Sequence, residues 1–246
     1  MGMTKKPAAR HGKLRLADVD LDEKLEDKKE YERRIEAVQL RLLRAQQREF
    51  HTSQRAVIAL EGWDASGKGG AIKRLTESVD PRGYQVHAIG APTAEEQGRH
   101  YLWRFWQKLP TPGRWAIFDR TWYGRVLVER VEKLVKKGVW GRAYDEINSF
   151  EKMLTDDGCR VVKIFLNIDK REQLVRFEER QANPYKKWKI TEEDWRNRKR
   201  WKEYEKAIDE MLTRTSTPAA RWNVVAANYK WYARVRVAEI IADALE

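Results

Sequence analysis

The sequence predicts an α/β fold in which helices cover a sheet of parallel strands. Five short apolar runs, at residues 56–60, 84–89, 115–119, 161–168 and 222–226, are separated by segments with apolar residues at helical spacing. Alternation of strands with helices is typical of βαβ units, which build parallel sheets. The first run shows no polar alternation, as expected for a strand that is buried on both faces. We expect one domain.

Two segments precede the first strand. Residues 1–17 are basic and contain too few apolar side chains to pack, so we expect a flexible N-terminal arm. Residues 18–50 carry apolar side chains at helical spacing, which predicts an N-terminal helix. Residues 18–246 are then expected to form the single domain.

The glycine-rich stretch at residues 61–70 follows the first strand and predicts a phosphate-binding loop. It matches the first seven positions of the pattern G-x-x-x-x-G-K-[ST], and a helical pattern follows it. In a strand–turn–helix unit, backbone N–H groups and the positive end of the helix dipole face an anion. Lys68 would reach the outer phosphates. The glycines expected to bring the backbone close to the anion are Gly62, Gly67, Gly69 and Gly70. The alternative is a glycine-rich turn without a ligand.

The eighth position of that pattern is Gly69, so the hydroxyl that normally ligates Mg²⁺ is missing. Asp64, inside the loop, is our candidate for the replacement oxygen. Asp119 ends the predicted strand at 115–119, where phosphate-loop proteins place a second metal anchor. The alternative for Asp119 is a strand cap before an amphipathic helix.

Three arginines follow Asp119 closely: Arg120, Arg125 and Arg130. We expect Arg120 and Arg125 to clamp phosphates, with residues 126–130 opening a helix. Other helices are expected from Pro92 or Thr93 through the aromatic residues at 101–106, over 140–157, and from Asn228 onward.

A basic helical hairpin at about residues 176–201 is predicted to form a lid. Pro184 breaks it, and its cationic side chains are Arg176, Arg180, Lys186 and Lys187. Phosphate-loop kinases use mobile lids of this kind to close over the transferring phosphates and exclude water. The alternative is a charged hairpin without such a role.

The composition favours a polyanionic partner or an anionic surface. The 246 residues include 50 Lys and Arg against 38 Asp and Glu, for a net charge of +12. The single cysteine, Cys159, excludes an internal disulfide framework and fits the cytoplasm. No apolar run approaches the ~20 residues of a membrane span, and no signal core follows the first charges. We therefore expect a cytoplasmic protein without a membrane partner.

Together, the stretches at 61–70, 118–123 and 189–196 resemble the type-2 polyphosphate kinase family. The resemblance covers about residues 20–246. It is closest to the catalytic repeat of polyphosphate:AMP phosphotransferases, through residues 101–106 and 123–132.

This resemblance implies a P-loop kinase-like three-layer fold with a five-stranded parallel sheet and a helical lid. It also implies Mg²⁺ dependence and a homodimer or homotetramer. The implied reaction moves a terminal phosphoryl group reversibly from inorganic polyphosphate to a nucleoside monophosphate or diphosphate. The favoured acceptor is AMP, which would be converted to ADP. Lys68 would act on the transferring phosphate and Asp64 and Asp119 on Mg²⁺, while Arg130 and the lid cations would line the polyphosphate track.

Three alternatives remain open on the sequence. The acceptor could be ADP or GDP, giving ATP or GTP. An ATP-dependent nucleoside monophosphate kinase would share the loop, sheet and lid, although a single ATP does not need so basic a surface. A nucleic-acid-binding protein would fit the charge and the tryptophans among lysines and arginines. Two carboxylates beside the loop argue against it, and we expect no specific nucleic acid.

Overall fold

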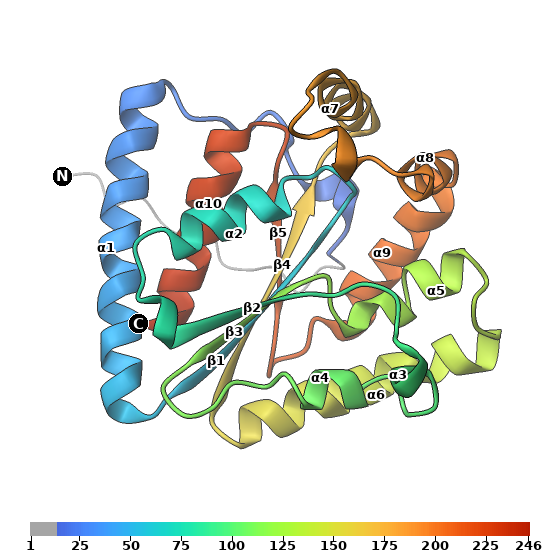
Figure 1. The fold of residues 1–246 in the computed structure, drawn as a ribbon, viewed down its shortest axis with the longest axis horizontal. Coiled ribbons are helices and arrows are strands. Elements are labelled where there is room, and N and C mark those ends of the chain that lie inside the picture. The colour runs from blue at the N-terminus through green and yellow to red at the C-terminus, as the bar shows by residue number, and fades with distance from the viewer. Residues whose placement is uncertain (1–13) are drawn as a thin grey trace.

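The computed structural model describes residues 14–246 and has five parallel strands in one sheet, in the order β2-β3-β1-β4-β5 (Figure 1). The bounds are Arg55–Gly62 (β1), Tyr84–Ala88 (β2), Trp115–Asp119 (β3), Cys159–Asn167 (β4) and Trp222–Ala226 (β5). All five predicted strands are therefore confirmed. Residues 56–60 of β1 are completely buried at the centre of the sheet. That burial explains why this strand is apolar without alternation.

Helices cover both faces of the sheet and give three layers. One face carries α1 (Lys28–Thr52), α2 (Lys68–Thr76) and α10 (Lys230–Leu245). The other carries α5 (Val128–Val131), α6 (Lys137–Asp156) and α9 (Trp201–Thr215). Short 3₁₀ turns lie at Leu16–Asp18, Pro81–Gly83, Trp122–Arg125 and Lys187–Lys189. None of the helices within residues 14–246 is long and apolar enough to cross a membrane.

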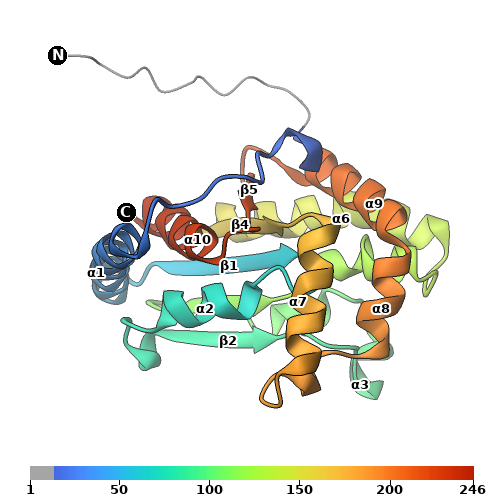
Figure 2. The same ribbon diagram turned by 90° about the horizontal axis from the view of Figure 1, so that it is seen from above.

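Two further helices, α7 (Lys170–Ala182) and α8 (Glu192–Lys199), stand at the carboxyl ends of the strands (Figure 2). The predicted break at Pro184 lies between them. Asp169 begins α7 as its N-cap, because its side chain accepts a hydrogen bond from the Glu172 amide. The predicted lid region thus has the expected two helices, although α8 ends at Lys199 and α9 starts anew at Trp201.

The N-terminal segment differs from the prediction at both of its boundaries. Most of the predicted arm, residues 1–13, lies outside the described residues. Leu16, however, is buried, and its N–H donates to Asp209 Oδ1 at 2.8 Å. Helix α1 begins at residue 28 and not at 18, because Asp27 caps it by accepting from the Glu30 amide.

Two predicted helices are broken into single turns. The aromatic stretch after residue 92 forms α3 (Ala94–Gln97) and α4 (Trp103–Trp106), with Gly98 at the end of the first. After Asp119, the 3₁₀ turn Trp122–Arg125 precedes the one-turn helix α5. Thr121 sets the turn, because its hydroxyl accepts from the Tyr123 amide. The helix predicted to open at residues 126–130 is present only as this single turn, which begins at Val128.

A fully buried ion pair lies between β4 and α6. Lys163 Nζ on β4 and Glu151 Oε2 on α6 are 2.7 Å apart, and both side chains are inaccessible to solvent. Lys163 also donates to Tyr123 Oη and to the Thr215 carbonyl, at 2.9 and 2.6 Å. Glu151 accepts from Trp122 Nε1 and from the Tyr123 hydroxyl. The pair therefore ties α6 and α9 to the segment that follows β3.

We expect Lys163→Met to lower the free energy of unfolding by ~3–5 kcal/mol, because it leaves a buried carboxylate without its partner. Adding Glu151→Gln removes that charge while keeping an acceptor for Trp122 and Tyr123, so the double variant should be more stable than Lys163→Met. Urea denaturation measures the free energy of unfolding of the wild-type protein, of Lys163→Met and of the double variant.

Lys152→Ala is the matched control, because it breaks the exposed Lys152–Asp156 ion pair on α6. An exposed pair contributes ~0–1 kcal/mol. A Lys163→Met protein as stable as the Lys152→Ala protein would contradict the structural role of the buried pair.

Candidate active site

The predicted phosphate loop lies at the carboxyl end of β1 and has the backbone that its glycines require. Gly62 and Gly67 have φ of +152° and +110°. A Cβ at Gly62 would lie 2.6 Å from the Leu166 carbonyl oxygen, so no larger residue fits. Lys68 Nζ donates to the Gly62 carbonyl at 2.9 Å. This contact closes the loop on itself.

Other parts of the loop leave polar groups and space for an anion. Gly67 is the N-cap of α2, so the N-terminal N–H groups of a nine-residue helix face the loop. A Cβ at Gly69 would meet nothing within 4 Å, whereas one at Gly70 would touch the Arg234 guanidinium. Ser66 Oγ is buried and has no hydrogen-bond partner. Ser66 is not among the predicted site residues, because a buried hydroxyl without a partner is visible only in three dimensions.

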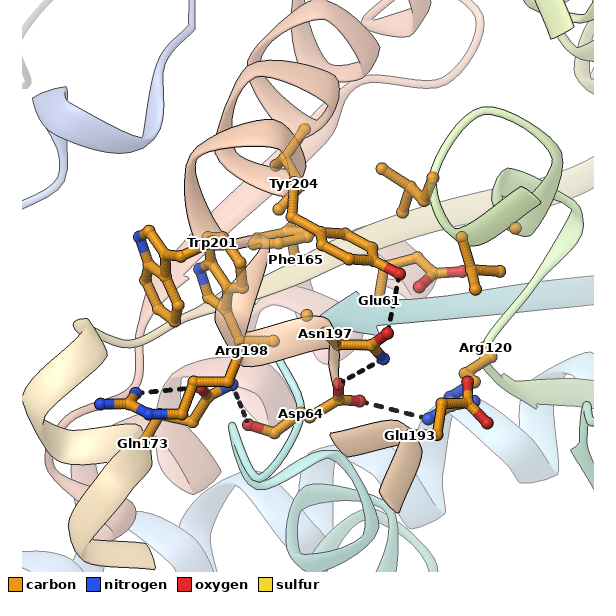
Figure 3. Close-up of a pocket in the computed structure, with 16 residues that line it drawn as sticks. Glu61, Asp64, Arg120, Phe165, Gln173, Glu193, Asn197, Arg198, Trp201 and Tyr204 are labelled. Carbon is orange, nitrogen blue, oxygen red and sulfur yellow. Dashed lines mark hydrogen bonds and ion pairs between the residues drawn. The ribbon is translucent and has the colours of Figure 1, made fainter. Parts of the chain in front are cut away.

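Asp64 and Arg120 meet across this edge of the sheet (Figure 3). Arg120 Nη2 donates to Asp64 Oδ1 at 3.2 Å. Burial opposes the charge of Arg120, but the surrounding carboxylates, Asp64 first, outweigh it and raise the pKa of the guanidinium. Arg120 has a φ of +64°, a left-handed conformation that costs energy in a non-glycine residue and is enriched at functional sites.

Glu61, which the sequence analysis did not select, fixes the segment that carries Arg120. Its carboxylate is buried and accepts from both the amide and the hydroxyl of Thr121, each at 2.7 Å. Burial raises the pKa of Glu61, while Lys68 and Thr121 work in the opposite direction. The first residue of the loop thus connects the end of β1 to the chain just after β3.

The carboxylates at this edge suit Mg²⁺. Asp119 is half-buried at the end of β3, where it pairs in register with Leu60. Asp64 lies in the phosphate loop, which follows the neighbouring strand β1. Within residues 14–246 no three or more His, Cys, Asp or Glu side chains cluster as a metal cage. Mg²⁺ fits such a site, because it usually takes one or two carboxylates and completes its shell with water and substrate phosphates.

Arg176 has a different position from the one predicted on the polyphosphate track. It is buried, and Nη1 donates to the Ala65 and Ser66 carbonyls at 3.0 and 2.9 Å. Nη2 donates to the Ala227 and Asn228 carbonyls, and Nε donates to Glu172. Every nitrogen of the guanidinium is engaged, so Arg176 supports the loop from behind and does not present its charge to a ligand.

Arg125 and Arg130 also have protein partners. Arg125 pairs with Glu129 at 3.1 Å and lies over the Tyr101 ring, and its Nε has no hydrogen-bond partner. Arg130 pairs with Glu210 at 2.8 Å and donates to Tyr144 Oη. The structure therefore ties Arg130 to α6 and α9, contrary to its predicted place on the track.

The remaining lid cations differ in exposure. Burial lowers the pKa of Arg180, although Asp194 and Asp64 oppose this effect. Lys186 and Lys187 are exposed at the tip between α7 and α8. Two aromatic side chains share this tip, Tyr185 at 88% and Trp188 at 75% exposure. The tip is thus a cationic and aromatic surface open to solvent.

A pocket is lined by residues of the phosphate loop and of the lid helices (Figure 3). Its polar side includes Asp64, Arg120 and Asn197. The apolar side is lined by Leu127, Val128, Phe165, Trp201 and Ile208. Trp63 in the loop stacks on Trp201 at the start of α9, with ring centroids 3.7 Å apart and an interplanar angle of 4°.

A parallel sheet, a phosphate loop at its carboxyl edge and a helical hairpin above it define a phosphate-loop protein with a lid. Residues 25–246 match the family model described as Polyphosphate kinase 2. The chain belongs to that family.

Individual relatives agree with this assignment. A polyphosphate:AMP phosphotransferase from Pseudomonas syringae pv. tomato is 48% identical over 241 residues, which are 98% of this chain and 48% of that protein. The chain therefore spans about half of that relative's length. An ADP-polyphosphate phosphotransferase from Pseudomonas aeruginosa is 39% identical over 208 residues, covering 85% of this chain and 68% of that protein.

A solved structure agrees as well. The crystal structure of Polyphosphate Kinase 2 from Arthrobacter aurescens TC1 superposes with a TM-score of 0.91 at 36% sequence identity. The match covers 96% of this chain and 86% of that one. The predicted P-loop kinase-like fold with its five-stranded parallel sheet is confirmed.

We expect Arg176→Lys to loosen the phosphate loop while the protein stays folded, because one ammonium cannot reach four carbonyls on two segments. The Ser66 amide, which donates to the Trp63 carbonyl, should exchange its hydrogen about tenfold faster by local opening. Mass spectrometry of a peptide covering residues 61–72 measures this exchange.

Arg171→Lys is the control, because Arg171 is exposed on the same helix. Unchanged exchange in the Arg176→Lys loop would show that the carbonyl contacts do not hold it.

Proposed function

We propose that the protein transfers a terminal phosphoryl group between inorganic polyphosphate and a nucleoside phosphate, with AMP as the preferred acceptor. The observation that carries the proposal is the contact of Asp64 with Arg120, both of which line the pocket between the lid helices and the loop that carries Lys68. Phosphoryl transfer needs positioning and electrostatic stabilisation more than covalent chemistry. This site offers both cationic and carboxylate groups for that purpose.

The catalytic roles follow from these positions. Lys68 would leave the Gly62 carbonyl to bind the transferring phosphate. Arg120, held by Asp64 and backed by Glu61, would stabilise the charge that develops on the phosphoryl oxygens. Asp64 and Asp119 would hold Mg²⁺, which supplies a positive charge to the phosphate oxygens when bound.

The nucleotide would enter the pocket between the loop and the lid. Its apolar side chains suit a base and ribose, while Arg120 lies at its polar side. Arg125, whose Nε has no hydrogen-bond partner, would be a clamp for the acceptor phosphate. Lys186 and Lys187 on the lid, with Arg180 behind them, would meet the polyphosphate chain.

ADP is the second candidate acceptor. A relative named ADP-polyphosphate phosphotransferase matches most of this chain, so the same framework is compatible with an added β-phosphate. The greater identity to a polyphosphate:AMP phosphotransferase favours AMP.

A cytoplasmic homodimer or homotetramer is also part of the proposal. The outer edge of β2 is unpaired within residues 14–246, and Val86 on this strand is 41% exposed. An exposed edge of this kind suits contact with a second copy. Burial raises the pKa of the Cys159 thiol to about 11, so this cysteine is an unreactive core residue.

With long-chain polyphosphate and Mg²⁺, we expect AMP to be converted to ADP with a higher kcat/KM than ADP to ATP. Initial rates with AMP, ADP, GMP and GDP, with the products resolved, test this expectation. A tenfold preference for ADP, about 1.4 kcal/mol of transition-state stabilisation, would refute AMP as the acceptor while leaving polyphosphate use intact.

The substitutions Lys68→Ala, Asp64→Asn and Asp119→Asn should each lower kcat by at least ~10²-fold, because each removes one charged contact in the site. Retained activity in any of these variants would refute the role of that residue.

The paired change Lys186→Ala and Lys187→Ala should weaken the apparent affinity for polyphosphate and flatten its dependence on salt, because fewer counterions are released on binding. The KM for the nucleotide should change little. Initial rates over a range of KCl concentrations provide both values.

Lys136→Ala with Lys137→Ala removes an adjacent exposed pair outside the lid and serves as the control. Equal losses for polyphosphate and nucleotide in the lid variant would indicate a closure defect and contradict a direct contact with the polyanion.

A further inference from the structure

Asp64 is held from two sides, and one of the two partners belongs to the lid. Asn197 on α8 donates from Nδ2 to Asp64 Oδ2 at 3.0 Å. Arg120 donates to the other oxygen, Oδ1. The two oxygens of one carboxylate therefore connect the lid to the chain segment after β3 (Figure 3).

The orientation of the Asn197 amide is itself fixed. Tyr204 on α9 donates its hydroxyl to Asn197 Oδ1 at 3.0 Å. Because an ionised carboxylate can only accept, the NH₂ group must face Asp64, and the amide oxygen is left to accept from the Tyr204 hydroxyl. Tyr204 is almost fully buried, at 9% exposure, so its ring is held by packing.

The chemistry of this contact suits a carboxylate that also binds a cation. Ionised Asp64 has about four lone-pair directions, so two hydrogen bonds leave room for a metal. An amide orients the carboxylate without neutralising it, whereas a lysine at this position would compete with the cation. Hydrogen-bond partners of metal-binding carboxylates commonly tune metal affinity.

We propose that Asn197 is a positioning residue that orients Asp64 for a divalent cation, and that Tyr204 orients Asn197. The inference rests on the proposed role of Asp64 as a Mg²⁺ ligand. Its consequence is that the metal site is complete only when α8 and α9 are packed over the loop. The lid then controls cation binding as well as access to the pocket.

The test is binding of Mn²⁺, a paramagnetic substitute for Mg²⁺, to the full chain without nucleotide or polyphosphate, measured from the free-ion signal in electron paramagnetic resonance. Asn197→Ala should weaken Mn²⁺ binding about tenfold, within the ~10–100-fold range for such outer partners. Tyr204→Phe keeps the ring packing and should weaken binding by a smaller factor. Asn148→Ala is the control, because that side-chain amide also donates one hydrogen bond, to the Arg214 carbonyl, but lies away from the loop.

Each outcome decides for or against the proposal. Weaker binding in both site variants, at unchanged Tm, supports it. Unchanged binding in both, or no binding to the wild-type protein, overturns it. Tighter binding would mean that Asn197 competes with the metal and would also overturn it. If Asn197→Ala does not fold, Tyr204→Phe alone decides. A protein that binds Mn²⁺ as expected but transfers no phosphoryl group would refute the proposed function and leave this inference standing.

Discussion

The geometry of the site depends on the hydrogen bonds that the buried guanidinium of Arg176 donates to the backbone. Four carbonyl oxygens converge on it, two from the phosphate loop and two from the segment after β5. A buried charge is stable only when its donors are satisfied, and here backbone dipoles and Glu172 satisfy them. Because Arg176 lies on α7, the base of the lid is joined to the loop by the same contact.

A second set of buried contacts controls the opposite wall of the site. Glu61 holds Thr121, and the Lys163–Glu151 pair holds Tyr123, so both sides of the turn after β3 are fixed. Arg120 is thereby kept in a left-handed conformation that it would not adopt alone. Rigid support of this kind lets a charged side chain face a substrate without first reorganising.

The sheet and the phosphate loop were predictable because their signals are local. Buried strands need apolar runs, and the loop needs glycine at positions such as Gly62, where a neighbouring carbonyl excludes a side chain. The broken helices after residues 92 and 126 were mispredicted, because apolar spacing does not reveal a stop at Gly98 or a turn set by Thr121.

The site was only partly predictable. Asp64, Lys68, Asp119 and Arg120 do lie at one edge of the sheet, as the spacing indicated. The predicted place of Arg176 on the polyphosphate track is wrong, since an arginine in a basic helix gives no sign that carbonyls from two distant segments will surround it. Glu61 and Asn197 gave no signal at all, because their roles arise from partners far away in the sequence.

The stacked indoles of Trp63 and Trp201 have a spectroscopic consequence. Two parallel indoles at van der Waals distance couple their electronic transitions, and one belongs to the loop while the other belongs to the helix that follows the lid. Separation of the two rings would remove that coupling from the circular dichroism spectrum. The protein therefore contains an intrinsic optical reporter of whether α9 keeps its contact with the loop, without any attached dye.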